Sequence, residues 1–537
     1  MSRSSRSPRP PLRPWQEKAL VRFESGTEPD FLAVATPGAG KTTFALEAAQ
    51  RALAAGRVRR VVVVTPTQHL KRQWARAADA FGLALEAEWT SRSALPADFH
   101  GVVVTYQQVA SSKATLRRLS AHAFVVLDEV HHAAESRSWG DAIRLAFDAS
   151  PRRLAISGTP FRSDENPIPF VRYVDSVAVA DYDYGYAAAL ADGGVVRPVF
   201  FPRLGGRMEW TAPDGSQQAA SFDDALDPAL ASQRLRTALS ASGQWLDTVL
   251  AQANEQLVEL RRTDPTAAGM VIAIDREHAR AVAALLRARA GIVPTVALSD
   301  DPGASGRILR FARGDAPWIV AVRMVSEGVD IPRLRVGVYA TSTRTDLFFR
   351  QAVGRLVRFT PGDERQSAYF YLPDDPRLRS FAVSIQEERR HALAPRRDDG
   401  AGEGPPRPPR EERPVRENLF APISAVPEGE FRLVAPVAPT ETKRGPAPAS
   451  SEDSRLGVHV DAPASPSSAA LSLRERREAL RQRNATLVRE LVHRKRRSHA
   501  EVNAELNRRV GLSKVTEATL AQLERRVAAA EAWLRRR

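Results

Sequence analysis

Short apolar runs alternate with stretches of helical spacing through the first 200 residues. The runs FLAVA, VVVVTP, GVVVTY, FVVLDE and RLAISGTP each stop where small, polar or charged residues begin. Strand followed by helix, repeated in this way, predicts an α/β fold with a parallel sheet. In such a sheet the functional residues lie at the carboxyl ends of the strands.

A second series of apolar runs follows with the same rhythm. It comprises VVRPVFF, AGMVIAID, PTVALS, PWIVAVRM, LRVGVYAT and SAYFYLP, and a long helical segment at 226–262 separates its first two members. A chain of 537 residues is too long for one core, since single domains commonly hold about 100 to 200 residues. The pattern therefore predicts two α/β units in tandem, at 11–195 and 196–394.

Periodicity is lost after residue 394 and returns near residue 471. Residues 395–470 are rich in Pro, Ala, Glu and Ser and predict a disordered linker, apart from a piece around ENLFAPIS or FRLVAP that could dock. From 471 to 537 a small all-helical domain is expected. Ser498 and Glu501 form a potential capping box, Gly511 is a suitable helix end, and a third helix is expected at 516–534.

Charge is concentrated at the two ends of the chain. The net charge is +15, and residues 471–537 hold 18 Lys+Arg against 8 Asp+Glu, while a disordered N-terminus at 1–10 is also basic. Basic ends on a near-neutral body favour a polyanionic partner such as nucleic acid, although solvated tails without a partner have the same composition. The C-terminal helices fit either a helix-turn-helix against duplex DNA or a helical hairpin that docks a protein.

Composition excludes several other classes of protein. There is no cysteine, which removes disulfides, thiolate zinc sites and iron–sulfur clusters and leaves a hard cation as the favoured metal. No apolar run approaches the roughly 20 residues of a membrane span, and the N-terminus lacks the apolar core of a secretory signal. We therefore expect a cytoplasmic protein with no membrane partner.

The first apolar run leads directly into the glycine-rich stretch TPGAGKTT, Thr36–Thr43. Gly38 and Gly40 allow backbone N–H groups to converge on phosphate oxygens, Lys41 can reach the β- and γ-phosphates, and the Thr42 hydroxyl can bind Mg²⁺. The strict P-loop pattern has Gly where this chain has Ala35, and a glycine-rich turn without nucleotide is the alternative. We expect ATP and Mg²⁺ here. The predicted binding residues are Thr36, Pro37, Gly38, Ala39, Gly40, Lys41, Thr42 and Thr43.

Two adjacent carboxylates end the fourth apolar run. Because a P-loop holds Mg²⁺ from one side only, Asp128 is predicted to bind the metal from a neighbouring strand. Glu129 is predicted to orient and deprotonate the attacking water. His131 and His132 could suggest zinc, but no further imidazole or thiolate partner stands at a suitable spacing, so hydrogen bonding beside the phosphates is favoured.

A basic helical stretch, FFRQAVGRLVR, closes the second unit. Gln351, Arg355 and Arg358 are spaced four and three residues apart and so share one helix face. Two guanidinium groups presented together suit a phosphoryl group that gathers charge during transfer. An amphipathic basic helix with no catalytic task is the alternative.

Taken together, these motifs resemble those of superfamily 2 helicases and translocases of the DExH kind. The likeness covers about residues 10–390 and includes type III restriction subunits among the related motors. Motifs I, II and VI are ATPGAGKTT, DEVH and QAVGRLVR; LRPWQ, VTPTQHLKRQW, VTYQ, SGTPFRSD and VRMVSEGVDIP resemble the Q motif and motifs Ia, Ib, III and V. Two tandem RecA-like P-loop domains are the fold that this resemblance implies.

The resemblance also implies roles for further residues. Gln16 would hydrogen-bond adenine, and Gly328 and Asp330 would face the nucleotide. Arg355 and Arg358 would be the finger arginines. Motif II histidine His131 is grouped with Ser157 and Thr159, which would couple hydrolysis to domain movement. Nucleic acid would be contacted by Thr65, Pro66 and Thr105.

Three functions remain open at this point. The first is an ATP-dependent DNA helicase, with DNA favoured over RNA. The second is a duplex translocase without unwinding activity, the motor subunit of a restriction or phage-defence complex that would need a nuclease or other defence or repair subunit as partner. The third is a nucleotide-gated nucleic-acid-binding module with vestigial hydrolysis, which the presence of Lys41, Asp128, Glu129, Arg355 and Arg358 disfavours.

Overall fold

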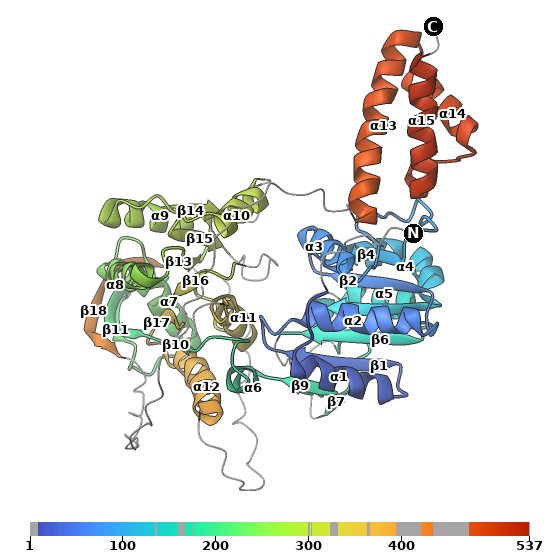
Figure 1. Ribbon diagram of the computed structural model, residues 1–537. Coiled ribbons are helices and arrows are strands. Elements are labelled where there is room, and N and C mark those ends of the chain that lie inside the picture. The colour runs from blue at the N-terminus through green and yellow to red at the C-terminus, as the bar shows by residue number, and fades with distance from the viewer. Residues whose placement is uncertain are drawn as a thin grey trace, which may run out of the picture. The chain divides into compact units, whose positions relative to one another are not determined.

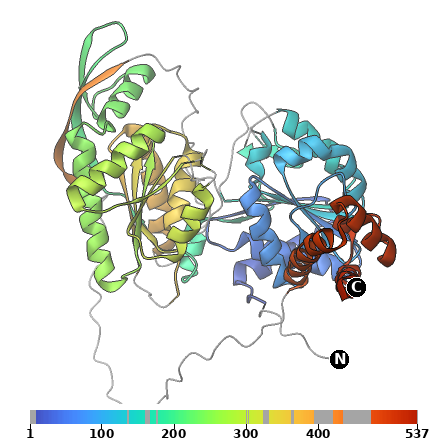
Figure 2. The same ribbon diagram turned by 90° about the horizontal axis from the view of Figure 1, so that it is seen from above.

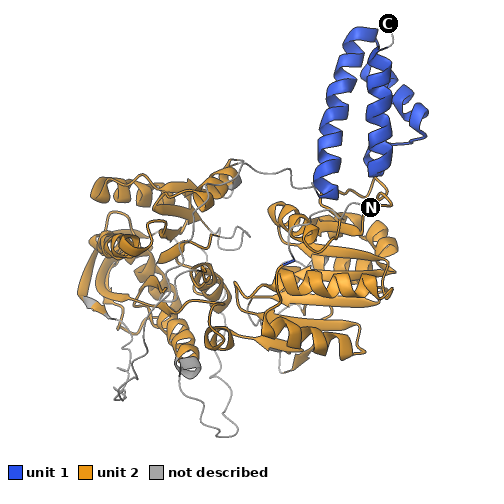
Figure 3. Cartoon of the chain, in the orientation of Figure 1, with its two compact units in different colours: residues 1–9, 434–537 blue, residues 10–433 orange. Residues whose placement is uncertain are grey.

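A computed structural model describes residues 9–134, 137–158, 167–174, 177–298, 301, 303–322, 331–361, 366–393, 420–432 and 472–535. The chain divides into two compact units (Figure 3): one comprises residues 10–433, and the other joins residues 1–9 with residues 434–537. Two lobes, each built on a mainly parallel sheet, make up the larger unit (Figure 1).

The first lobe contains a seven-stranded parallel sheet in the order β3-β4-β2-β5-β6-β1-β9 within the described residues. Its strands are β1 (Asp30–Ala35), β2 (Arg60–Thr65), β3 (Leu85–Glu86), β4 (Gly101–Thr105), β5 (Ala123–Asp128), β6 (Arg152–Ser157) and β9 (Tyr182–Tyr184). A separate two-stranded antiparallel ribbon, β7 (Tyr173–Val174) and β8 (Val177–Ala178), comes between β6 and β9 in the sequence. All five apolar runs predicted as strands are confirmed.

Helices cover both faces of this sheet (Figure 2). One face packs against α1 (Pro14–Ser25), α2 (Lys41–Ala54) and α3 (Gln68–Asp79), the other against α4 (Tyr106–Ser120) and α5 (Arg137–Phe147). Short helices η1 (Val130–Ala134) and α6 (Tyr186–Ala191) complete the lobe. Because both faces are buried, the central strands are continuous valine-rich runs rather than alternating ones.

The second lobe has a mixed sheet in the order β12-β11-β17-β16-β13-β15-β14, with β10 beside β17 and β18 beside β11. Its strands are β10 (Val199–Phe200), β11 (Arg203–Thr211), β12 (Gln217–Ser221), β13 (Ala268–Ala273), β14 (Thr295–Ala297), β15 (Trp318–Val322), β16 (Leu334–Ala340), β17 (Ala368–Pro373) and β18 (Ala421–Arg432). Helices α7 (Pro228–Ala238), α8 (Gln244–Thr263) and α9 (Arg276–Ala290) pack on one face, and α10 (Ala304–Arg313), α11 (Asp346–Leu356) and α12 (Pro376–Leu393) on the other. Every apolar run of the second series forms a strand.

Two features of this lobe differ from the sequence prediction. The helical segment predicted at 226–262 is two helices, because the chain leaves the helix after α7 and Gly243 caps the start of α8. An antiparallel hairpin of β11 and β12 precedes them and was not predicted. Its turn contains Asp214 and Gly215, a typical hairpin pair, and Gly215 has a φ of 86° that favours glycine.

Strand β18 lies where the sequence allowed a docked piece within the linker predicted at 395–470. It pairs antiparallel with β11 from Thr211↔Ala421 to Arg203↔Arg432. Ala425 is buried in the second-lobe core, and the Phe431 ring meets Tyr371 edge-on at 5.5 Å. The exception made for a docked piece around ENLFAPIS or FRLVAP is therefore confirmed, and apart from residues 420–432 the predicted linker lies outside the described residues.

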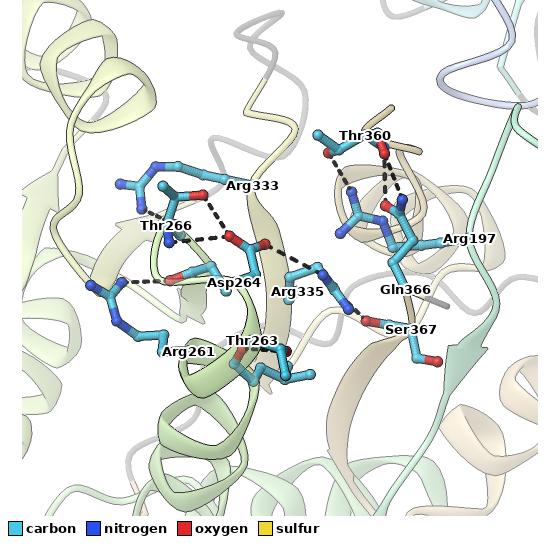
Figure 4. Close-up of polar contacts among 12 residues, drawn as sticks. Arg197, Arg261, Thr263, Asp264, Thr266, Arg333, Arg335, Thr360, Gln366 and Ser367 are labelled. Carbon is cyan, nitrogen blue, oxygen red and sulfur yellow. Dashed lines mark hydrogen bonds and ion pairs between the residues drawn. The ribbon is translucent and has the colours of Figure 1, made fainter. Parts of the chain in front are cut away.

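Buried arginines hold the loops at the amino edge of the second sheet (Figure 4). Arg333 donates to the carbonyl oxygens of Thr266 at 2.9 Å, Ala316 at 2.9 Å and Phe311 at 2.6 and 3.1 Å. Burial, and then the nearby Arg261, lower the pKa of Arg333 to about 10. Arg335, two residues after Arg333 and within β16, donates to the Ser367 carbonyl at 2.7 Å. These side chains replace backbone pairing where strands begin.

The smaller unit is helical in its described residues: α13 (Leu473–Lys495), α14 (His499–Val510), a short turn η2 (Val515–Glu517) and α15 (Leu520–Arg535). The Ser498–Glu501 capping box and the helix end at Gly511, with φ 66°, are confirmed. The third helix starts at Leu520, not at 516, because a Thr519–Gln522 pair caps it. The predicted fold class is confirmed: two α/β RecA-like domains and an all-helical C-terminal region.

Helix α15 runs parallel to α13. Helix α14, which lies between these two helices in the sequence, returns the chain so that α15 can start beside the start of α13. The ion pairs Arg476–Glu524 at 3.0 Å and Arg483–Glu531 at 3.1 Å advance by seven residues on both helices, which fixes this direction. Arg526 is buried at their contact and donates to three asparagine side chains, those of Asn484, Asn503 and Asn507. Neither the helix-turn-helix nor the docking hairpin is decided by this arrangement, and both stay predictions.

Candidate functional site

The glycine-rich turn lies between β1 and α2, at the carboxyl edge of the first sheet. Gly38 and Gly40 have φ values of 85° and 92°, a region that only glycine enters at low cost, and Gly40 caps the start of α2. Lys41 is the first residue of that helix, and its Nζ donates to the Ala35 carbonyl at 3.1 Å. Thr42 and Thr43 follow in the first turn, half-buried. A helix N-terminus behind two left-handed glycines is suited to bind phosphate.

Three side chains just before and within α1 brace this turn. Arg13 Nη1, Trp15 Nε1 and Gln16 Nε2 donate to the carbonyl oxygens of Gly38, Ala39 and Gly40 at 2.8, 3.0 and 2.9 Å. Gln16 Oε1 also accepts from the Arg13 backbone N–H at 2.7 Å, and the residue is 1% exposed. The Gln16 carboxamide thus supports the turn itself, and its contact with adenine stays a prediction.

Asp128 ends β5 in a largely buried position. Its Oδ2 accepts a hydrogen bond from Trp74 Nε1 at 2.7 Å, and its backbone carbonyl accepts one from the Tyr106 hydroxyl at 2.9 Å. Burial, followed by the negative charge of Glu129, raises the pKa of Asp128 to about 7. A buried carboxylate whose charged form is disfavoured in this way would be stabilised by a cation.

Glu129 follows in the left-handed region, with φ 46°, so the two acids point in different directions. Its carboxylate accepts from the Gly158 N–H at 3.2 Å and lies 3.7 Å from Lys41 Nζ. Burial alone would raise the pKa of Glu129, but Lys41, His131 and the Gly158 N–H outweigh it and lower the pKa. Glu129 is therefore ionised at neutral pH, as a general base must be.

His131 links motif II to both neighbouring motifs. Its Nδ1 lies 3.3 Å from Ser157 Oγ, and its Nε2 lies 3.0 Å from Gln351 Nε2 in α11. Both ring nitrogens of His131 therefore have a polar neighbour, one at the end of β6 and one in α11. The structure thus brings together two residues of the predicted coupling group, His131 and Ser157, and joins them to Gln351, which was predicted as a catalytic residue.

Helix α11 lies against the glycine-rich turn. A Cβ atom added to Gly354 would lie 2.4 Å from Pro37 Cγ, and one added to Gly38 would lie 3.4 Å from Arg358 Cγ. The segment between the lobes also meets this helix end, because Val196 forms a bridge with Arg358. Arg355 lies one turn after Gln351 and is half-buried. The lysine-bearing turn and the basic helix therefore border the same site.

Some predicted residues are placed elsewhere or fall outside the description. Thr65 and Thr105 are buried, and their hydroxyls bond within the chain: Thr65 Oγ1 donates to the Thr67 carbonyl, and Thr105 Oγ1 caps α4. The contact of these two threonines with nucleic acid stays a prediction, and Pro66 is half-buried beside them. Thr159, Gly328 and Asp330 lie outside the described residues.

The donor set fits Mg²⁺ better than a metal held by protein alone. Within the described ranges, no group of three or more His, Asp or Glu side chains is arranged to hold a metal ion. Mg²⁺ is commonly bound by one or two carboxylates together with substrate phosphates and water. Asp128 and the Thr42 hydroxyl, the two donors predicted from the sequence, are oxygen groups of the kind that this coordination uses.

Four functional candidates were missed in the sequence: Arg13, Trp15, Trp74 and Tyr106. The first two belong to the LRPWQ motif itself, so their proximity to Gln16 was an available signal. Trp74 is 54 residues from Asp128, and no spacing rule predicts that contact.

Comparison with known proteins relates this chain to one family model and to three mycobacterial proteins. The family described as the type III restriction enzyme res subunit matches residues 9–162. The uncharacterized protein MT2985 of Mycobacterium tuberculosis strain CDC 1551/Oshkosh is 42% identical over 96% of this chain and 92% of its own. Rv2917 of strain H37Rv is 47% identical over 81% and 69%, and ML1624 of Mycobacterium leprae is 45% identical over 77% and 71%.

Among solved structures, a fragment of a putative HsdR subunit of a type I restriction enzyme from Vibrio vulnificus YJ016 has a TM-score of 0.47, 17% identity, and coverage of 68% of this chain and 65% of that one. The match of residues 9–162 to the res-subunit family supports a motor of the superfamily 2 helicase type in this chain. The chain belongs to the same family as the mycobacterial proteins MT2985, Rv2917 and ML1624. No helix in the described part of the chain has the length and apolar character needed to cross a bilayer.

Proposed function

We propose that this protein is a nucleic-acid-stimulated ATPase that moves along DNA. The observation that carries the proposal is the meeting of Lys41, the Asp128–Glu129 pair and α11 around one turn, with Gln351 Nε2 3.0 Å from His131 Nε2. A P-loop, a carboxylate pair and arginines from a second lobe are the parts that phosphoryl transfer requires.

Each side chain has a task in this proposal. Lys41 leaves Glu129 and the Ala35 carbonyl to bind the β- and γ-phosphates. Glu129 orients the attacking water and takes its proton. Arg355 and Arg358 stabilise the charge that gathers on the transferred phosphoryl group. Thr42 and Asp128 would hold Mg²⁺, which when bound offsets phosphate charge.

Coupling to movement follows from the contacts between the lobes. Gln351, His131 and Ser157 form one hydrogen-bonded series from α11 to the end of β6. Loss of phosphate would weaken the hold of Arg355 and Arg358 and so change the lobe contact. Nucleic acid would bind at the carboxyl edge near Pro66 through backbone contacts, so little sequence preference is expected.

ATP hydrolysis rates measured without nucleic acid and with single-stranded DNA, duplex DNA or RNA test this proposal. We expect stimulation by DNA. Glu129→Gln should lower turnover by about 10² to 10⁴ while retaining ATP binding, and Lys41→Ala should abolish turnover. Glu259→Gln, an exposed acid in α8, is the matched control. Normal hydrolysis in Glu129→Gln would contradict the site, and binding without any hydrolysis in the natural chain would favour a nucleotide-gated module.

A translocase without unwinding activity is the second candidate, supported by the match of residues 9–162 to a restriction-enzyme subunit family. Such a motor would act beside a nuclease or another defence or repair subunit. Forked duplexes and blunt triplexes separate the two candidates. Unwinding of forks indicates a helicase, whereas triplex displacement without unwinding indicates a translocase.

A further inference from the structure

Two buried donors from different helices converge on Asp128. Trp74, 1% exposed in α3, donates its indole N–H to the carboxylate oxygen Oδ2 at 2.7 Å. Tyr106, fully buried at the start of α4, donates its hydroxyl to the backbone carbonyl at 2.9 Å. One donor fixes the carboxylate, and the other fixes the peptide that leads into the left-handed Glu129.

The indole bond determines which oxygen can face a cation. Trp74 donates to Oδ2, so Oδ1 is the oxygen that this bond leaves open and that would be offered to a cation. An indole N–H is a donor only, so it cannot compete for the metal and cannot be reversed by a proton shift. A buried ring in a close-packed core also has little freedom to turn. Trp74 therefore suits the orientation of a metal-binding carboxylate.

Both helices begin at the edge where nucleic acid is expected. Thr67 caps α3 directly after Pro66, and Thr105 caps α4 directly before Tyr106. The two helices are also tied together, because buried Lys71 donates to Gln108 Oε1 at 3.1 Å. If bound nucleic acid shifts the start of either helix, the helix would carry that shift to Asp128 over a rigid segment of two turns or fewer.

We propose that Trp74 and Tyr106 are positioning residues that set Asp128 for metal binding and connect it to bound nucleic acid. The inference rests on the proposed ATP site. Because coupling between two binding sites is reciprocal, nucleic acid should raise the affinity for Mg²⁺-nucleotide, and Mg²⁺-nucleotide should raise the affinity for nucleic acid. Removing the indole donor should weaken both effects.

The test measures binding of a fluorescent ADP analogue to the full chain as Mg²⁺ is titrated, with and without single-stranded DNA. Trp74→Phe keeps an aromatic ring and loses only the donor and part of the bulk. We expect its Mg²⁺ half-saturation to rise about 10- to 100-fold and the DNA effect to shrink, with unchanged binding in the absence of Mg²⁺. Trp318→Phe is the matched control, since Trp318 is also buried and donates to Asn254 Oδ1 at 3.0 Å in the second lobe.

Tyr106→Phe tests the same inference with a smaller change. It should lower the catalytic rate several-fold with little change in KM for ATP, because it loosens the peptide before Glu129. Unchanged Mg²⁺ dependence in Trp74→Phe, or an equal effect in Trp318→Phe, would overturn the inference. If Trp74→Phe does not fold, a Tyr106→Phe rate equal to that of the natural chain would overturn it instead. Failure of the natural chain to bind the analogue at any Mg²⁺ concentration would instead contradict the proposed function.

Discussion

Gly354 is the position where a single methyl group tests the meeting of the two lobes. In Gly354→Ala the new Cβ would lie 2.4 Å from Pro37 Cγ and 2.8 Å from Pro37 Cβ, well inside van der Waals contact. Alanine favours a helix interior by up to about 1 kcal/mol over glycine, so α11 and its lobe should not be weakened. Overpacking at a fixed contact costs about 1 to 3 kcal/mol.

That cost falls on the assembled site alone. Since about 1.4 kcal/mol is a factor of ten, the assembled state should become roughly 5- to 150-fold rarer, and kcat/KM for ATP should fall by a similar factor. Steady-state hydrolysis measures the loss, and thermal unfolding shows whether the lobe stays intact. The expected result is lower activity with an equal or higher melting temperature.

Gly306→Ala is the matched control for this change. Gly306 is also in a helix, α10, but its added Cβ meets only Arg310 Nη1 at 3.9 Å, so activity should be preserved. Pro37→Gly in the Gly354→Ala background removes both clashing atoms and should restore part of the rate relative to Pro37→Gly alone. An unchanged kcat/KM in Gly354→Ala would show that α11 and the glycine-rich turn do not meet during turnover.

Two further changes test the second lobe and the basic helices. Arg333→Met leaves the carbonyl groups of Thr266, Phe311 and Ala316 without their buried donor and should lower the free energy of unfolding by about 3 kcal/mol in urea denaturation. Arg262→Met, at an exposed ion pair with Glu259, should change the same free energy by less than about 1 kcal/mol. Equal effects of the two would refute a structural role for Arg333. Deletion of residues 472–537 should flatten the salt dependence of DNA binding and spare basal hydrolysis. An unchanged slope would assign these helices to a protein partner.

The strands and the phosphate-binding elements could be predicted because their signals are local. Val61–Val64 is a continuous apolar run because both faces of the strand are covered, and such runs stand out in any sequence. Gly38 and Gly40 were predictable because the backbone conformation they need is one that other residues avoid. In the same way, Ser498 and Glu501 are three residues apart, the spacing of a capping box, and so predict a helix start.

The remainder depends on contacts between distant parts of the chain. Strand β18 contains proline, glycine and glutamate, so its own residues do not predict a strand, and its partner β11 lies far away in sequence. The Trp74–Asp128 bond likewise exists only because α3, which packs on β2 and β4, brings its indole to the end of the neighbouring strand β5. Thr65 and Thr105 had motif positions that suggested contact with a strand, but only the structure reveals that their hydroxyls are used internally.

Strand β18 also sets when the second lobe can be completed during synthesis. Its Ala421 pairs with Thr211, 210 residues earlier, so β11 emerges from the ribosome long before its outer neighbour exists. Until then the edge of β11 has unpaired backbone N–H and C=O groups. Such an edge can be bound by chaperones or can pair with a strand of another chain. A nascent or recombinant chain that stops at residue 394 would keep every motor motif and still expose this edge permanently.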